Sequence, residues 1–254
     1  MDPTLSVAEG LAVLAAGAAA GAINAVVGSG TLVTFPVLLA AGYPPVVANV
    51  SNTVGLVPGS FSSLYAYRKD LVGHGPLLLR LGIAAVFGGV TGGLLLLWLP
   101  QGAFRAIVPT LIGLALVLVV AQPWLARTLS RRRGEDGQRV GPLLLFGVFG
   151  TGIYGGYFGA AQGVLLLGLL GVLLSTDLRW VNGVKNLLAG LVNAVAATLF
   201  LALGAVAWQP ALLIAAGSVI GGLIGGRWGR RLPPLVLRVL IVVVGLAALV
   251  KLLA

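Results

Sequence analysis

Thiol, acidic and imidazole side chains are scarce in this sequence. The chain has no cysteine, a single histidine and six acidic residues among its 254 residues. Without cysteine no disulfide or thiolate metal site can form, and no metal or other cofactor is expected. The acids all lie at the ends of apolar segments or between them: Asp2, Glu9, Asp70, Glu135, Asp136 and Asp177.

The same scarcity argues against an enzyme. An intramembrane aspartyl protease needs two buried acids, and a serine nucleophile needs a base within the membrane. Ser29 has no such base, because the only histidine, His74, falls in a predicted loop. Gly30 is followed by Thr31-Leu32, whereas a phosphate-binding P-loop requires Lys followed by Ser or Thr.

Apolar residues dominate what remains. The chain is 59% hydrophobic and 9% charged, and its mean hydropathy is +1.08. A soluble core of this length does not need so much apolar surface, so the composition predicts a polytopic membrane protein. The net charge of +10 comes from basic residues in short loops between apolar segments, which is the positive-inside pattern. The expected partner is therefore the lipid bilayer and not nucleic acid.

Eight apolar segments are of ordinary length and two are short. The longer ones are Val7–Val27, Val46–Tyr67, Pro76–Leu99, Phe104–Leu125, Pro142–Phe158, Val181–Leu203, Trp208–Gly226 and Pro234–Leu253. The short segments, Thr31–Ala41 and Val164–Leu174, have eleven residues each. At 1.5 Å per residue they cannot cross about 30 Å of hydrocarbon, so they are expected to be half-helices or re-entrant segments.

The two halves of the chain resemble each other. A shift of 133 residues places Gly30 on Gly163 and Asn49 on Asn182. The same shift superposes the glycine pairs Gly88-Gly89 and Gly221-Gly222 and the two short segments. The pattern indicates a duplication, with a first repeat over residues 1–126, a basic cytoplasmic linker over 127–140 and a second repeat over 141–254.

Basic loops predict the orientation of the repeats. Dense clusters occur at Arg68-Lys69, Arg127–Arg139 and Arg227–Arg231, and all three should face the cytoplasm. This holds if each half consists of a broken or re-entrant helical hairpin followed by three full transmembrane helices. The net number of crossings per half is then odd, which gives an all-α protein with two inverted-topology repeats. A broken helix giving four crossings per half would place Arg227–Arg231 outside and is disfavoured.

Lys185 is the only charged residue inside the predicted span Val181–Leu203. A cation at the centre of a membrane helix costs about 2.5–3.5 kcal/mol on insertion scales, and no acid in the sequence lies where it could offset this. The missing counter-ion therefore suggests an anionic ligand. The alternative is that Lys185, only six residues after Arg179, extends to the cytoplasmic face.

Polar residues near the two interruptions form the candidate substrate site. Each interruption precedes a half-helix, whose N-terminus favours anions, and buried amides supply further donors. Asn182, Lys185, Asn186 and Asn193 share one helix face. The candidate residues are Asn24, Gly28, Ser29, Gly30, Asn49, Ser51, Asn52 and Thr53 in the first half and Gln162, Gly163, Asn182, Lys185 and Asn186 in the second. For any single amide, hydrogen bonding between helices is an equally good explanation.

Two GxxxG pairs lie in apolar spans, Gly88/Gly92 and Gly221/Gly225. Such pairs let two helix backbones approach closely. Packing within the chain is the simpler interpretation, and a homodimer through these faces is the alternative.

Several motifs resemble those of the TauE/SafE family of sulfite and organosulfonate exporters. They are Val27-Gly28-Ser29-Gly30, Pro36-Val37-Leu38-Leu39, Gly42-Tyr43-Pro44-Pro45, Ala48-Asn49-Val50-Ser51-Asn52-Thr53 and, in the second half, Gly155-Gly156-Tyr157-Phe158-Gly159 and Val181-Asn182-Gly183-Val184-Lys185-Asn186. The likeness covers essentially the whole chain. It implies a permease of the bacterial inner membrane that exports a small sulfur-containing anion such as sulfite or sulfoacetate. A passive anion channel and a purely structural membrane protein are the alternatives.

The predicted topology can be tested by labelling single cysteines with an impermeant thiol reagent in intact cells. Arg68→Cys, Arg132→Cys and Arg230→Cys should stay unlabelled because basic loops face the cytoplasm. Gln101→Cys and Val206→Cys should react. Labelling at position 230 without labelling at position 206 would reverse the orientation of the second half and contradict the inverted repeat.

Overall fold

The computed structural model describes residues 5–131, 141–174, 178–204, 206–228 and 234–253, where it consists of α-helices joined by turns and loops, with no strand. The ten helices are α1 (Val7–Val26), α2 (Thr31–Ala40), α3 (Pro45–Tyr67), α4 (Gly75–Trp98), α5 (Gln101–Arg131), α6 (Pro142–Tyr157), α7 (Gln162–Leu173), α8 (Leu178–Leu203), α9 (Trp208–Trp228) and α10 (Pro234–Leu253). The all-α prediction is confirmed. The helix α5 runs to Arg131, and the remainder of the predicted linker lies outside the described residues.

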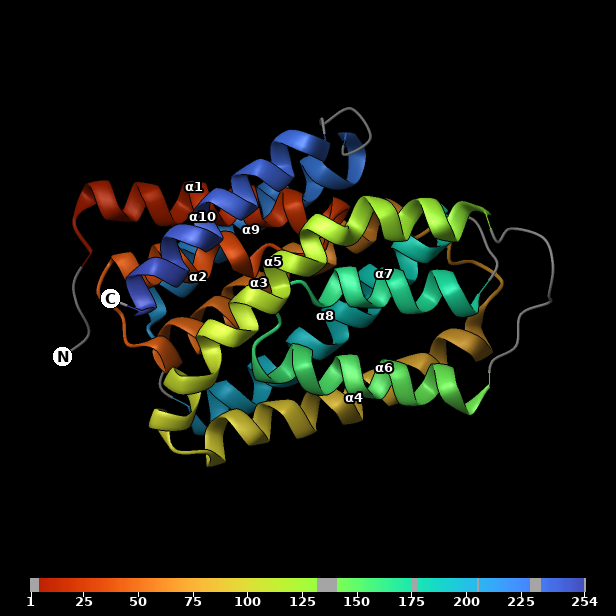
Figure 1. The fold of residues 1–254 in the computed structure, drawn as a ribbon, viewed down its shortest axis with the longest axis horizontal. Helices are drawn as coiled ribbons and strands as arrows, with labels where there is room; N and C mark the ends of the chain where they lie inside the picture. Colours follow the sequence, from red (N-terminus) through yellow and green to blue (C-terminus); the bar gives the residue numbers. More distant parts are fainter. Residues whose placement is uncertain (1–4, 132–140, 175–177, 205, 229–233, 254) are drawn as a thin grey trace.

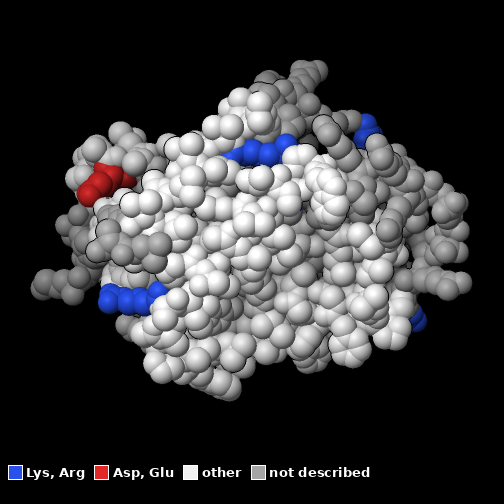
Figure 2. Space-filling model, in the orientation of Figure 1, with Lys and Arg blue, Asp and Glu red and all other residues white. Residues whose placement is uncertain are grey.

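Within the described residues, five helices are long and apolar enough to cross a membrane: α1, α4, α5, α8 and α9. The two short apolar segments are also helices, α2 and α7, of 10 and 12 residues. Much of the visible face in Figure 2 carries no charged side chain, and the blue and red residues lie far apart from one another. A surface of this kind is suited to contact with lipid.

The short helices α2 and α7 begin near the centre of the molecule and run toward opposite ends (Figure 1). α1 and α2 form one hairpin, and α6 and α7 form the other. The helices α3 and α8 pack against each other, α3 also packs on α9 and α8 on α4, and α9 and α4 pack in turn on α1 and α6. Exchanging α1–α5 with α6–α10 reproduces the principal helix pairs, since α2 packs on α10 as α7 packs on α5.

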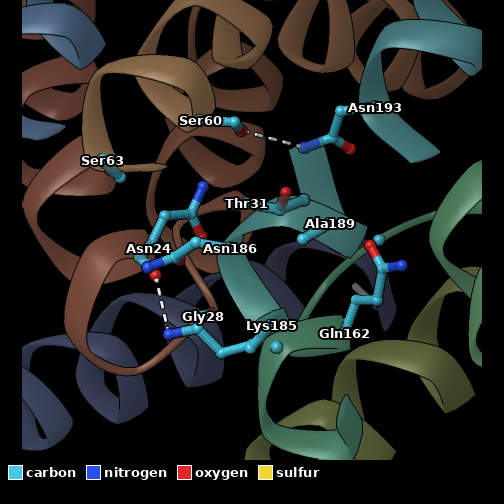
Figure 3. Close-up of a pocket in the computed structure, with 12 residues that line it drawn as sticks. Asn24, Gly28, Thr31, Ser60, Ser63, Gln162, Lys185, Asn186, Ala189 and Asn193 are labelled. Carbon is cyan, nitrogen blue, oxygen red and sulfur yellow. Dashed lines mark hydrogen bonds between the residues drawn. The ribbon is translucent and has the colours of Figure 1, made fainter. Parts of the chain in front are cut away.

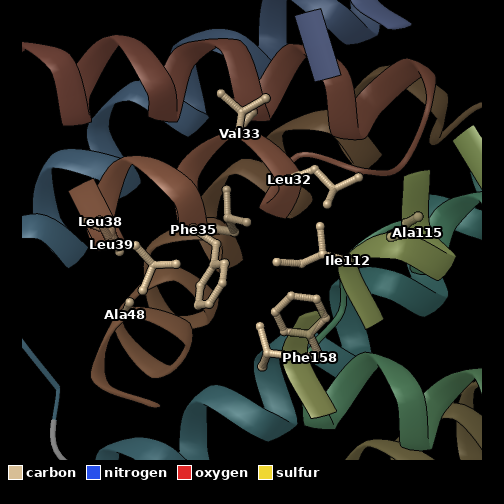
Figure 4. Packing of buried hydrophobic residues seen from close by; sticks show 14 of the residues in the cluster. Leu32, Val33, Phe35, Leu38, Leu39, Ala48, Ile112, Ala115 and Phe158 are labelled. Carbon is tan, nitrogen blue, oxygen red and sulfur yellow. The ribbon is translucent and has the colours of Figure 1, made fainter. Parts of the chain in front are cut away.

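The half-helix α2 is surrounded by protein. Nearly all of its side chains are buried, and they pack on α3, α5 and the turn after α6 (Figure 4). The Phe35 and Phe158 rings pack edge to face with centroids 5.3 Å apart, and the Phe104 centroid lies 6.2 Å from that of Phe158. A helix that ends inside the membrane leaves polar backbone groups there, which is tolerated only where protein or a cavity covers them.

Basic residues gather where α3 and α9 end and α8 begins. Lys69 and Arg179 line one hollow there together with Asp70, and Arg68 and Arg227 line an adjacent one. Each hollow holds about 440 Å³. The first turns of α1 and α9 meet elsewhere, where Leu5 N donates to Gln209 Oε1 at 3.3 Å.

The GxxxG glycines are buried at helix contacts within the chain. A Cβ on Gly88 or Gly92 would collide with the α6 backbone at Phe149 or Ile153. A Cβ on Gly221 would collide with the α1 backbone at Ala18. The backbones can therefore approach closely at these positions only because glycine has no side chain.

Gly221→Val should destabilise the protein by on the order of 1–3 kcal/mol, the usual cost of overpacking a tight contact. The matched control is Gly150→Val, because Gly150 is also helical but has no atom near the position of an added Cβ. Thermal unfolding of the purified variants in detergent measures the difference. Equal melting temperatures for the two variants would contradict the packing of α1 on α9.

Candidate functional site

The tips of the two hairpins meet inside the protein. Gly163 N, at the start of α7, donates to Gly28 O across the contact at 3.0 Å. Gly28 has φ +84°, and a Cβ there would overlap the backbone of Gly163. At the other tip Ala161 has φ +61°, the only positive φ of a non-glycine residue in the described chain. At each tip the backbone thus reverses direction through a residue in the left-handed conformation, which leaves room for the opposing tip.

Lys185 extends from α8 to the end of α1. Its side chain is fully buried, so it does not reach the surface as the alternative of an extended side chain requires. The ammonium Nζ donates to Asn24 O at 3.2 Å (Figure 3) and to Ala25 O at 3.3 Å. These carbonyls belong to the last turn of α1 and have no partner further along the helix. A cation at this end also interacts favourably with the helix dipole.

A small cavity lies beside this ammonium (Figure 3). It holds about 20 Å³, room for about one water molecule. Its lining residues come from α1, α2, α3, α7, α8 and both interruptions: Asn24, Gly28, Thr31, Ser60, Ser63, Gly159, Gln162, Gly163, Lys185, Asn186, Ala189 and Asn193. Lys185 is the one charged residue in this described lining.

The electrostatic environment of the cavity is positive. The N-termini of α2 and α7 lie at its wall through Thr31, Gln162 and Gly163, and each contributes a partial positive charge. Gln162 Nε2 is buried and has no hydrogen-bond partner among the described residues. An ammonium has three N–H donors, and two of those on Lys185 are used by carbonyls. Helix ends, an open amide and the remaining ammonium donor are groups that bind an oxyanion.

Six of the predicted site residues line the cavity: Asn24, Gly28, Gln162, Gly163, Lys185 and Asn186. Two more predicted residues, Ser29 and Gly30, directly follow Gly28 in the sequence. Gly30 N donates to Asn24 Oδ1 at 2.7 Å, which fixes the turn into α2. Ser29 is fully buried, and its Oγ has no partner among the described residues.

The other predicted residues lie outside the cavity lining. In α3, Asn49 Nδ2 donates to Tyr157 O at 2.9 Å, and Thr53 Oγ1 donates to Asn49 O at 2.9 Å. Ser51 Oγ accepts from Ala207 N at 2.8 Å. Asn52 contacts α2, because its side chain bonds to Thr31 and Thr34. Asn182 lines the basic hollow at the start of α8. Asn49 and Asn52 thus connect α3 to α6 and α2, whereas Thr53 bonds within α3.

Sequence reasoning did not place Thr31, Ser60, Ser63, Gly159 and Ala189 in the site, and it put Asn193 on the helix face of Lys185 without naming it among the candidate residues. Asn193 Nδ2 donates to Ser60 Oγ at 3.4 Å, across the contact between α3 and α8 (Figure 3). Two signals were available: Asn193 follows Asn186 by two helical turns, and Ser60 and Asn193 are separated by the repeat distance of 133.

Comparison with known proteins gives one family. The family described as sulfite exporter TauE/SafE matches residues 13–252. A probable membrane transporter protein, ORF9, from Sinorhizobium sp. is 31% identical and covers 92% of this chain and 88% of its own. The probable membrane transporter protein YfcA of Escherichia coli K12 is 28% identical over 92% of this chain and 86% of its own. No solved structure matches the chain significantly.

The two tips allow a paired test of backbone strain. Gly28→Ala should lower the melting temperature, because an alanine at positive φ costs about 1–2 kcal/mol and its Cβ would overlap Gly163. Ala161→Gly should leave the melting temperature unchanged or raise it, because it removes the same strain. Thermal unfolding of the purified proteins measures both. A Gly28→Ala protein as stable as the wild type would show that the tips do not meet in this way.

Proposed function

This chain belongs to the sulfite exporter TauE/SafE family of membrane transporters, and we propose that it exports a small sulfur-containing anion across the bacterial inner membrane. Sulfite, sulfoacetate or a related organosulfonate is the proposed substrate class. The anion binds in the cavity where the two hairpin tips meet, at the interface of the two repeats.

One observation carries this proposal. The Lys185 ammonium is fully buried beside a cavity whose other described lining residues are neutral. Its partners are the carbonyls of Asn24 and Ala25, which are polar but carry no full negative charge. A buried cation is expensive without a counter-ion, and an oxyanion held by Lys185 and Gln162 supplies that charge only when bound.

We further propose that the two halves are inverted repeats. The helix contacts support this, because exchanging the halves reproduces the principal pairs. Two positive-φ residues, Gly28 and Ala161, are separated by the repeat distance. Ser60 and Asn193 are separated by it too, and they bond to each other. Equivalent residues touch only close to a two-fold axis, so the cavity lies near that axis, as in other carriers built from inverted repeats.

The distribution of charge supports export. Arg68, Lys69, Arg179 and Arg227 surround the hollows at one end, and the positive-inside rule assigns that end to the cytoplasm. A basic hollow raises the local concentration of anions. Asn182 lines the hollow and precedes Lys185 on α8. The membrane voltage then favours outward movement by about 2.3 kcal/mol per charge for each 100 mV.

The size of the cavity bears on the alternative of a passive anion channel. A space of about 20 Å³ is too small for an anion of several heavy atoms. The described conformation is therefore closed around the site, and passage requires the hairpins to move. A carrier predicts saturable flux and exchange between the two sides, whereas an open channel predicts flux that rises with concentration.

Lys185→Ala should weaken sulfite binding by roughly ten- to a hundredfold, because it removes a charge-assisted donor. Lys185→Arg should also transport poorly, since a planar guanidinium does not replace a compact ammonium. Lys185→Glu should be the weakest because it repels the anion. Binding by calorimetry and flux in proteoliposomes measure these effects over a panel of sulfite, sulfonates, sulfate and carboxylates.

Two controls make this result interpretable. Arg80→Ala removes a cation from an exposed position on α4 that does not line the cavity, and it should bind sulfite as the wild type does. The melting temperature without ligand must be recorded, because Lys185→Ala also removes a cap on α1 that is worth about 0.3–1 kcal/mol. Wild-type affinity in folded Lys185→Ala would refute the anion site.

A further inference from the structure

The end of α1 is closed by a side-chain cation. In carriers built from broken helices, the carbonyls at the ends of half-helices commonly coordinate a dissolved Na⁺. Here the corresponding carbonyls already have donors. Lys185 Nζ bonds to Asn24 O and Ala25 O at 3.2 and 3.3 Å, and Asn186 Nδ2 bonds to Ala25 O at 3.4 Å. The preceding carbonyl, Ile23 O, accepts from Val27 N and Gly28 N.

We propose that the Lys185 ammonium takes the place of a coupling cation, so that transport requires neither Na⁺ nor K⁺. The inference rests on the proposed function, because it concerns which positive charge balances the anion in the same site. The lysine supplies the positive charge that a co-transported ion would otherwise bring, and it remains attached to α8.

The charges around the cavity oppose a second cation. A dissolved cation at the end of α1 would lie beside the ammonium, where like charges repel strongly because little water screens them. The described lining contains no carboxylate that could hold such an ion: apart from Lys185 it consists of amides, hydroxyls, glycines and one alanine. Of the two acids that the structure describes, Glu9 bonds to Ser6 in the first turn of α1, and Asp70 follows α3 at the basic end.

The end of α6, at the second interruption, is capped in a comparable way. Its penultimate turn is capped by backbone groups, since Tyr154 O accepts from Phe158 N and Gly159 N. Its last carbonyl, Tyr157 O, accepts from Asn49 Nδ2 at 2.9 Å. Tyr157 and Asn24 are separated by the repeat distance of 133 residues. Side chains of α3 and α8 thus cap α6 and α1 across the interface between the halves, one with an amide and the other with an ammonium.

Sulfite efflux from proteoliposomes tests the inference. Wild-type protein is compared in symmetrical NaCl, KCl and N-methylglucamine chloride, with the melting temperature checked in each. The efflux rate should be the same in the three media, because no alkali cation takes part. Efflux that disappears when Na⁺ is replaced would overturn the inference and leave the proposed function standing. Absence of efflux for sulfite and every sulfonate tested in all three media would instead refute the proposed function.

A chemical rescue tests the role of the lysine itself. Lys185→Ala leaves the carbonyls of Asn24 and Ala25 without their ammonium, and its slow sulfite efflux should increase when methylammonium is added on both sides. Lys185→Glu and the wild type serve as controls, and neither should accelerate. A folded Lys185→Ala protein whose efflux methylammonium does not change would contradict the replacement of a coupling cation by Lys185.

Discussion

The central constraint in this protein is that two helical hairpins, α1–α2 and α6–α7, are interrupted in the buried interior of a membrane protein. An interruption leaves carbonyls at the end of one helix and N–H groups at the start of the next, and lipid can satisfy neither. In this protein the two interruptions lie side by side, so that Gly163 N donates to Gly28 O. The carbonyls at the end of α1 accept from Lys185. The same groups that satisfy the backbone create a positively charged cavity.

Under the proposed function, Lys185 has two roles that share one ammonium. Two of its donors hold the end of α1, and the charge remains available to an anion beside the N-termini of α2 and α7. Binding of an anion would therefore be coupled to the position of the hairpin that carries Asn24 and Gly28. Such coupling between a ligand and a movable element is what a carrier requires, since ligand binding can only shift an equilibrium between states that it distinguishes.

The helices and part of the candidate site could be predicted from the sequence. The apolar segments predicted the helices, and the two short segments matched α2 and α7 within about two residues at each end, a usual uncertainty for helix boundaries. Lys185 and Gln162 were identifiable because a cation or an amide next to an interrupted apolar segment needs an explanation. Ser60 and Ser63 were not, because small polar residues in a membrane helix are common. Their place at the cavity depends on how α3 crosses α8. Helix orientation also explains why Ser51 and Thr53, predicted in the site, bond elsewhere.

A structure determined with a heavy oxyanion tests the central claim most directly. Selenite is a suitable probe because its anomalous scattering locates it independently of the protein density. An anion site at Lys185 predicts one peak within hydrogen-bonding distance of Lys185 Nζ and Gln162 Nε2, between the first turns of α2 and α7. Peaks found only in the basic hollows near Arg179 and Arg227, with the central cavity unchanged at a saturating selenite concentration, would contradict it.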